Sequence, residues 1–244
     1  MAEERLSELM RYLADKAFPV GERLPSLPEL ARDLKLSVGK LREQLEVART
    51  LGLVEVRPKT GIRALPFSAF PGIWVSLRFA LSSDPGAFDQ FEALRHHVEA
   101  GFFHEAVRLL QPEDMRHLER LVAKAWERLN GEPIQIPHSE HRELHLTIYS
   151  RLANPYVLGI LEAYWEAYET AGLNVYSDYS YLHEVWSYHE RVVKGIVSGN
   201  YDDAHSALVE HTGLVRNRPH LASTRTVPLE EAEAAELGAR RRAS

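Results

Sequence analysis

The sequence predicts a mainly α-helical protein in two parts: a winged helix-turn-helix over residues 1–66 and an antiparallel bundle of six or seven helices over residues 72–220. Three observations predict this division. Apolar residues recur at helical spacing in both parts, the two short alternating runs typical of strands both lie before residue 66, and two prolines fall around the segment 67–71, which we expect to be a linker. Residues 221–244, rich in Ala, Glu and Arg, are predicted to form a disordered tail.

The composition excludes several classes of protein. The 244 residues are 45% hydrophobic and 26% charged, which is ordinary for a soluble globular protein. The chain has no cysteine, and this excludes disulfides, thiolate catalysis, cysteine-based zinc fingers and iron–sulfur clusters. Because the chain lacks both a long uncharged apolar run and an apolar N-terminal export segment, we expect no membrane partner and a cytoplasmic location.

The two parts differ in charge. The whole chain carries a net charge of −6, but residues 1–66 hold 12 Lys and Arg against 10 Asp and Glu, whereas residues 67–244 hold 17 against 25. All twelve histidines lie between His96 and His220. The N-terminal part is therefore slightly basic, and the C-terminal part is acidic and rich in imidazole.

Three helix signals and one hairpin signal make up the N-terminal part. The helices are expected over residues 3–16, 27–34 and 38–51, and the strands over residues 53–57 and 61–65. A serine stands in the capping position before each of the last two helices, and a Pro-Lys-Thr-Gly turn joins the two strands. Three helices followed by a small hairpin are typical of a winged helix-turn-helix.

A helix-turn-helix places its second helix in the major groove of DNA, where the N-terminal residues of that helix meet phosphates and base edges. Here those residues are Ser37, Lys40 and Arg42, and the tip of the wing adds Lys59 and Gly61. We expect these five residues to contact double-stranded DNA, the cations going to phosphate or guanine. The topology carries this prediction; the alternative is that the same charges are solvated on a protein-interaction domain.

Every pattern after the linker is helical. Turns rich in Gly, Pro and Asn separate the segments. The helices are expected over residues 72–82, 88–110, 112–129, 139–152, 155–171, 181–198 and 201–218. No alternating pattern interrupts them, and the second part is therefore predicted to be an antiparallel helical bundle.

Four histidines of this bundle form a candidate metal site. His141 and His145 lie four residues apart and project from one helix face, while His189 and His211 fall in the middle of two further helices. Imidazoles from facing helices commonly bind a divalent metal in a bundle core. The alternative is that these histidines are solvated or packing residues. The segment His-Arg-Glu-Leu-His places its glutamate one position too late for the metalloprotease motif HExxH.

The N-terminal motifs resemble those of GntR-family transcriptional regulators. The resemblance rests on Gly21-Glu-Arg-Leu-Pro-Ser, Leu30-Ala-Arg-Asp-Leu, Leu41-Arg-Glu, Leu51-Gly-Leu-Val-Glu-Val-Arg-Pro and Gly61. It implies a homodimer that binds a palindromic operator, with the five residues given above at the DNA. Many members carry a second basic residue where this chain has Val38, and a polar or basic residue where it has Pro28, which implies fewer base contacts here.

The C-terminal motifs resemble the FCD ligand-binding domain of the FadR subfamily. The resemblance rests on Leu144-His145-x-x-Ile148, Ala153-Asn154-Pro155, Tyr188-His189-Glu-Arg, Gly199-Asn200 and His211. That domain typically holds a divalent cation with three histidines and an aspartate four residues before the first of them, a position that His141 occupies here. The implied ligands are therefore His141, His145, His189 and His211, a neutral and softer set that favours zinc or nickel.

The same resemblance implies a small organic acid as effector. Arg95 and Glu99, four residues apart, match an early helix of the domain, and a guanidinium close to a cation suits a carboxylate. His183 is expected to line the same pocket. The alternative for Arg95 and Glu99 is a surface or interhelical ion pair of little energetic consequence.

The sequence thus predicts a homodimeric, metabolite-responsive transcriptional regulator and no enzyme. We expect a repressor whose binding to DNA is weakened by the effector. One alternative is a metal-free regulator that senses a larger acyl ligand. Another is a metal-dependent hydrolase with an accessory winged domain. Its candidate general bases, Glu143 and Glu190, are each expected to project away from the histidines of their own helix.

Overall fold

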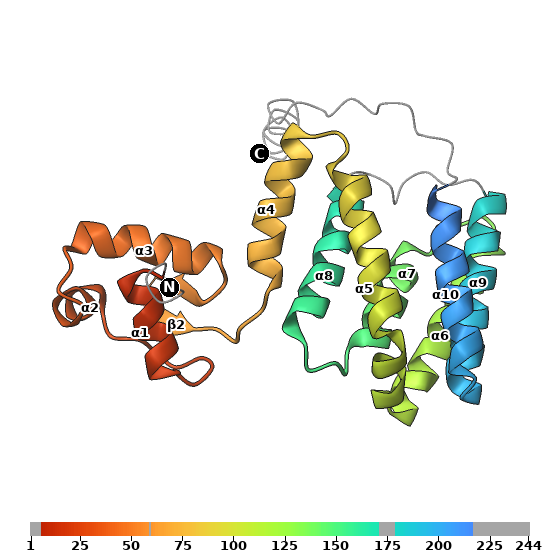
Figure 1. The fold of residues 1–244 in the computed structure, drawn as a ribbon, viewed down its shortest axis with the longest axis horizontal. Helices are drawn as coiled ribbons and strands as arrows, with labels where there is room; N and C mark the ends of the chain where they lie inside the picture. Colours follow the sequence, from red (N-terminus) through yellow and green to blue (C-terminus); the bar gives the residue numbers. More distant parts are fainter. Residues whose placement is uncertain (1–5, 59, 171–178, 217–244) are drawn as a thin grey trace.

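The computed structural model describes residues 6–58, 60–170 and 179–216, and over these residues it contains ten helices and two strands (Figure 1). The protein is mainly α-helical, with a winged helix near the N-terminus and a helical bundle after it, as the sequence predicts. The predicted tail, residues 221–244, lies outside the described residues.

A capping serine precedes each of the three helices of the winged helix. They are α1 (Glu8–Lys16), α2 (Leu27–Asp33) and α3 (Val38–Thr50). The hydroxyl oxygens of Ser7 and Ser37 each accept a bond from the amide three residues on, and the amide of Ser26 donates to the Glu29 carboxylate at 2.7 Å. Of the first helix, expected over residues 3–16, residues 3–5 lie outside the described part of the chain; the described helix begins at Glu8, after the cap Ser7.

The wing is a two-stranded antiparallel hairpin of β1 (Val54–Arg57) and β2 (Gly61–Ala64). Residues of both strands cover an apolar core inside the three helices. Its fully or almost fully buried members are Leu9, Leu24, Leu30, Ala31, Leu41, Ala48, Val54, Ile62 and Ala64. The side chain of Gln44 accepts a bond from the Leu9 amide at 2.9 Å and ties α3 to α1.

Seven helices follow the wing and run up and down beside one another (Figure 1). They are α4 (Phe70–Ser83), α5 (Ala87–Leu109), α6 (Pro112–Leu129), α7 (His138–Tyr149), α8 (Pro155–Thr170), α9 (Tyr179–Ser198) and α10 (Tyr201–Arg216). Helix α9 packs along α10 and α6, and α4 packs along α8. Over the described residues, none of these helices is both long and apolar enough to span a membrane.

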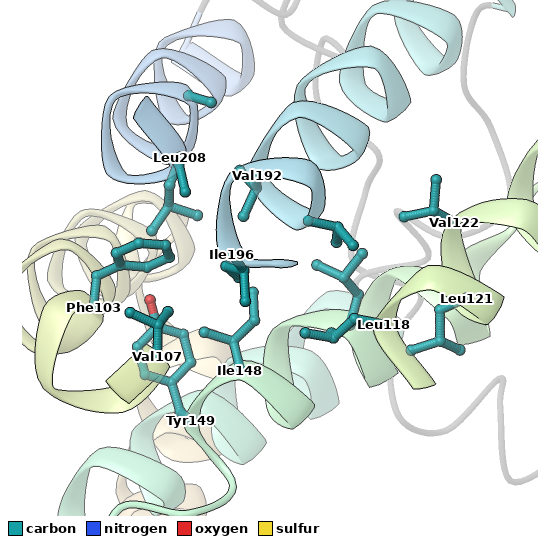
Figure 2. Close-up of a cluster of buried hydrophobic side chains, with 14 of the residues drawn as sticks. Phe103, Val107, Leu118, Leu121, Val122, Ile148, Tyr149, Val192, Ile196 and Leu208 are labelled. Carbon is teal, nitrogen blue, oxygen red and sulfur yellow. The ribbon is translucent and has the colours of Figure 1, made fainter. Parts of the chain in front are cut away.

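The apolar core of the bundle lies between α5, α6, α7, α9 and α10 (Figure 2). Phe103 and Val107 of α5 face Leu208 of α10, and Ile148 of α7 faces Ile196 of α9. Each of these side chains is essentially excluded from solvent. Packing of this core fixes how each helix is rotated about its axis. The same rotation sets which polar side chains meet next to the N-terminal half of α5.

The first turn of α4 is held between the two parts of the molecule. The helix begins at Phe70, two residues earlier than expected, because Pro71 occupies a first-turn position where its missing N–H is not needed. A Cβ atom on Gly159 of α8 would lie 2.7 Å from the Phe70 nitrogen, and one on Gly52 would lie 2.7 Å from Pro71 Cγ. The bundle and the end of α3 therefore both contact this turn with little space to spare.

Candidate metal centre and DNA-contacting surface

Four histidines from three helices converge inside the bundle. His141 and His145 lie one turn apart on α7, His189 lies on α9 and His211 on α10. One ring nitrogen from each lies within 4.8 Å of the others. Residues of α9 and α10 that belong to the apolar core lie on the same helix faces as His189 and His211. Packing of the core therefore turns these two histidines toward the inside of the bundle.

The spacing of the four imidazoles suits a small cation. His145 Nε2 and His189 Nε2 are 3.0 Å apart, and two nitrogens that bind one zinc ion tetrahedrally at about 2.0–2.1 Å lie about 3.3 Å apart. The ring centroids of His189 and His211 are 4.3 Å apart, and those of His141 and His189 are 4.6 Å apart. The four rings are therefore close enough to share one ligand.

The chemistry of the four rings also fits a transition metal. His145, His189 and His211 are at most 1% exposed, and His141 is half-buried. Burial, reinforced by the neighbouring rings and Arg95, holds the pKa values of His141, His189 and His211 well below that of a free imidazole. Neutral imidazoles keep a lone pair, and among the described residues neither His141 Nε2 nor His211 Nδ1 has a hydrogen-bond partner. A divalent transition metal would bind the lone pairs of neutral imidazoles such as these.

Arg95 and Glu99 of α5 lie directly behind this cluster. Glu99 Oε1 is 2.8 Å from His145 Nδ1, and Glu99 Oε2 is 2.9 Å from Arg95 Nε. Both side chains are fully buried, so the pair is not the surface ion pair that the sequence left open. Burial raises the pKa of Glu99, but Arg95 and His145 outweigh this effect and lower it to about 2. Glu99 is therefore a carboxylate.

Helix α8 supplies aromatic neighbours to Arg95 and to the four histidines. The Arg95 guanidinium carbon lies 4.4 Å from the centre of the Tyr164 ring, and the Tyr164 hydroxyl donates to buried Glu92 at 3.1 Å. Trp165 lies 4.7 Å from His141, centroid to centroid. The contacts of Tyr164 with Arg95 and Glu92 of α5 depend on how the two helices pack, for which the sequence carries no signal.

The residues expected to contact DNA lie at the exposed start of α3 and on the wing. Ser37 accepts the Lys40 amide at 3.1 Å, and the Lys40 ammonium lies 2.9 Å from Glu43. Lys40 and Arg42 are exposed to solvent. Lys59 lies outside the described residues, so the structure places only Gly61 at the wing, where its φ of +82° opens the second strand.

Two arginines that the sequence analysis did not select lie beside the wing. A Cβ on Gly61 would lie 3.1 Å from Arg23 Nε, and Arg63 Nη1 donates to the carbonyl of Gly21 at 2.7 Å. Residue 23 also pairs with residue 63 through an isolated backbone bridge. Arg63 belongs to β2, and Arg23 belongs to the segment before α2 that bridges to it. Their closeness depends on the backbone pairing at the wing, which a count of charges does not reveal.

Comparison with known proteins identifies the second part of the chain. The family model described as "FCD domain" matches residues 90–214, just over half of the chain. The chain belongs to the FCD family. Together with its relatives, this match shows a GntR-family transcriptional regulator with an FCD domain.

One curated relative and one solved structure agree with the identification. The "Uncharacterized HTH-type transcriptional regulator YcbG" of Bacillus subtilis (strain 168) is 23% identical over 227 residues, which are 89% of each chain. The structure of "Streptococcus agalactiae GntR" superposes with a TM-score of 0.60 at 21% identity, covering 88% of this chain and 99% of that one. The second likeness shows the fold alone. Proteins of this family bind DNA and typically act as dimers.

The hydrolase alternative has no support from this GntR regulator's relatives, which are transcriptional regulators. The two candidate bases also have other partners in the structure. Glu143 lies 2.8 Å from His117 Nε2, and Glu190 pairs with Lys194 at 2.7 Å. Both face away from the four histidines, as their sequence positions predict.

His183, which was expected to line the effector pocket of the FCD domain, is not brought to the cluster. It is exposed on α9 and packs against the Trp126 ring at 4.8 Å. His183 is six residues from His189, and six residues rotate a helix by about one and two-thirds turns, so the two rings leave different faces. A small pocket of about 20 Å³ instead reaches His141. Its wall includes Tyr168 and Trp186.

Proposed function

We propose that this protein is a dimeric, cytoplasmic repressor whose FCD domain binds zinc or nickel through His141, His145, His189 and His211, with a small organic acid as effector. The observation that carries the proposal is the convergence of four buried imidazoles within 4.8 Å. Four neutral nitrogen ligands favour a borderline transition metal over magnesium or calcium. Once bound, such a cation supplies a Lewis-acidic partner for an effector carboxylate.

The effector would approach from the side of His141. That histidine is the half-buried member of the four, and the pocket of about 20 Å³ beside it has aromatic walls. This space holds only a small group, such as one carboxylate end of a metabolite. Arg95 and Glu99 lie on the other side and are bonded to each other, so we propose that they support effector binding through the histidines.

The DNA-binding half of the proposal rests on α3 and the wing. Ser37, Lys40, Arg42, Lys59 and Gly61 would contact a palindromic operator, one half-site for each protomer. An effector that binds one arrangement of the two winged helices better than another changes DNA affinity by that difference in free energy. In a repressor relieved by its effector, the favoured arrangement is the one that fits the operator less well.

Elemental analysis tests the metal. The full chain, purified without tag or chelator, is expected to contain about one zinc or nickel ion per protomer, and H145A/H189A is expected to contain none. H97A/H183A is the matched control, because both of these histidines are exposed. Wild-type protein that stays metal-free after incubation with zinc and nickel would refute the metal site.

Titration of DNA tests the regulator. An operator is selected from random duplex DNA with metal-loaded protein, and its affinity is measured by fluorescence anisotropy against a panel of small mono- and dicarboxylic acids. We expect one acid class to weaken operator binding at least 10-fold with the wild type but not with H145A/H189A. If no acid changes the affinity, the effector class is wrong.

A larger cavity favours the second candidate, a metal-free regulator of an acyl ligand. A cavity of about 600 Å³ lies between the winged helix and the start of the bundle. Its lining is mainly apolar and includes Leu13, Phe18, Phe67 and Tyr156. Operator binding that responds to long-chain acyl esters in metal-free protein, and does not respond to small acids, would support this candidate.

A further inference from the structure

We propose that Glu99 is a positioning residue for the metal: it acts through His145, whose ring it orients, and supplies the negative charge that four imidazoles lack. This inference rests on the proposed metal site and goes beyond it. The four candidate ligands lie on α7, α9 and α10, whereas Glu99 belongs to α5. Helix α5 thereby becomes part of the metal centre without providing a ligand.

Hydrogen-bond chemistry fixes which nitrogen of His145 carries the proton. The Glu99 carboxylate accepts hydrogen bonds and cannot donate one, and its Oε1 lies 2.8 Å from His145 Nδ1. Arg95 Nη2 also lies 3.0 Å from Nδ1, but it can donate to Glu99 Oε1 at 3.3 Å, so we assign the proton to Nδ1 on the shorter contact with the carboxylate. The other ring nitrogen, Nε2, keeps its lone pair and lies 3.0 Å from His189 Nε2, in the direction of the cluster. Glu99 thus selects the tautomer of His145 that can bind a metal.

The Glu99 carboxylate is itself held in place from two sides. Arg95 Nε lies 2.9 Å from Oε2, and Arg95 Nη2 lies 3.3 Å from Oε1. The hydroxyl of fully buried Tyr149 donates to the backbone carbonyl of Glu99 at 2.9 Å. The Tyr164 ring lies against the Arg95 guanidinium. Arg95 therefore holds the carboxylate beside His145, and Tyr149 bonds the backbone of the same residue.

Charge gives Glu99 its second role. Four neutral imidazoles bring no negative charge to a divalent cation, and the nearby Arg95 guanidinium adds a positive one. Among the residues that the structure describes, Glu99 is the carboxylate bonded to one of the four imidazoles. A carboxylate behind a metal-binding histidine makes the imidazole a stronger donor, and loss of such a group typically lowers metal affinity 10–100-fold.

A matched pair of variants isolates the carboxylate. E99Q alone would leave Arg95 as an unpaired buried cation and destabilise the fold. We therefore compare R95M with R95M/E99Q, which differ only in whether residue 99 carries a charge. E92Q is the control, because Glu92 is also a buried acid on α5 but bonds to Tyr164.

Cobalt(II) is the probe, and the full chain is the sample. Cobalt affinity is measured by competition with a chromophoric chelator, and the visible absorption bands of the bound ion report its ligands. We expect E92Q to bind cobalt within threefold of the wild type. R95M, which has lost the Arg95 contact to Glu99, serves only as the reference for the double variant. R95M/E99Q is expected to bind cobalt 10–100-fold more weakly than R95M, with shifted absorption bands. Equal affinities and identical spectra for R95M and R95M/E99Q would overturn the inference.

A measurement on the wild type covers the case in which R95M/E99Q does not fold. Nitrogen-15 chemical shifts of the zinc-loaded protein identify the protonated nitrogen of His145, assigned by its loss in H145A. We expect a protonated Nδ1 and a zinc-bound Nε2; zinc on Nδ1 would overturn the role of Glu99. Wild-type protein that binds neither cobalt nor zinc refutes the proposed metal site itself, so the two failures are distinguishable.

Discussion

The cores of the winged helix and of the helical bundle are built from different materials. In the winged helix, Leu9, Leu30 and Leu41 are fully buried, and Gln44 is the buried polar side chain among its described residues. The bundle has an equally apolar region (Figure 2), but it also encloses a group of buried acids, histidines and one arginine, called the polar seam below. Its buried polar or charged members are Glu92, Arg95, His96, Glu99, Glu140, His145, His189 and His211.

This difference predicts that the stability of the winged helix does not depend on metal or on moderate changes of pH, whereas that of the bundle does. Apolar burial stabilises the winged helix at any metal concentration and at any moderate pH. The polar seam of the bundle destabilises the fold when its buried imidazoles have no ligand. Binding of a cation stabilises the fold. Four predictions test this contrast, from the largest expected effect to the smallest.

Replacing Leu41 by alanine removes a side chain from the centre of the winged-helix core. L41A is expected to destabilise that domain by roughly 3–5 kcal/mol and to abolish operator binding. Metal content of the bundle should remain at the wild-type level, because Leu41 belongs to the winged-helix core and not to the bundle core. Calorimetry, DNA binding and elemental analysis check the three parts. V47A, on the exposed face of the same helix, is the control and should cost little.

Metal is expected to stabilise the bundle and leave the winged helix unchanged. At a free zinc concentration of 100 times the dissociation constant, the bundle should gain about 3 kcal/mol. Differential scanning calorimetry with and without a chelator measures this gain as a rise in the melting temperature of one transition. H145A/H189A should lose it. A zinc effect of equal size in that variant would place the binding site elsewhere.

The metal-free bundle is expected to lose stability in mild acid. The pKa values of His141, His189 and His211 lie well below the unfolded value of about 6.5, mainly because the rings are buried. The unfolded chain therefore binds more protons than the folded one near pH 6. Stability is fully present above pH 6.5 and falls as the pH decreases, by about 2 kcal/mol in total between pH 7 and pH 6. Urea denaturation of chelator-treated protein at each pH measures the slope, and a flat profile would contradict it.

Removing the cap of α3 is expected to have the smallest effect. The Ser37 hydroxyl accepts the Lys40 amide at 3.1 Å, and S37A should destabilise the winged helix by about 1 kcal/mol. S37T retains an acceptor oxygen and should recover most of the loss. Urea denaturation provides the stability, and operator titration provides the DNA affinity. S37A with wild-type values of both would mean that the cap matters to neither.

The sequence predicted the elements well where apolar periodicity decided them. The helix expected over residues 112–129 coincides with α6, because Pro112 starts it and a capping box with Asp114 fixes its first turn. The meeting of the four histidines was also foreseeable, since the FCD resemblance and their helical spacing pointed to the same residues. The burial of Arg95 and Glu99 was not, because an i, i+4 ion pair has the same spacing on a surface and in a core.

Two other features depend on information that spacing does not contain. The rotation of α9 decides that His183 faces solvent, and this rotation follows from how Val192, Val193 and Ile196 pack. The closeness of Arg23 to the wing follows from the hairpin, whose register a sequence pattern does not give. In both cases, tertiary packing determines the position of a side chain that the local sequence does not determine.

The two glycines around the first turn of α4 have a mechanical consequence. At Gly159 the backbone of α8 touches the backbone of α4, and at Gly52 the end of α3 touches Pro71. The nearest atoms are backbone atoms and the Cβ of Ala69 at Gly159 and the Pro71 ring at Gly52, none of which can move aside easily. Trp165, on the same helix as Gly159, rests against His141. A small movement of α8 at the histidines would therefore be passed on to the start of α4 and from there to the end of α3.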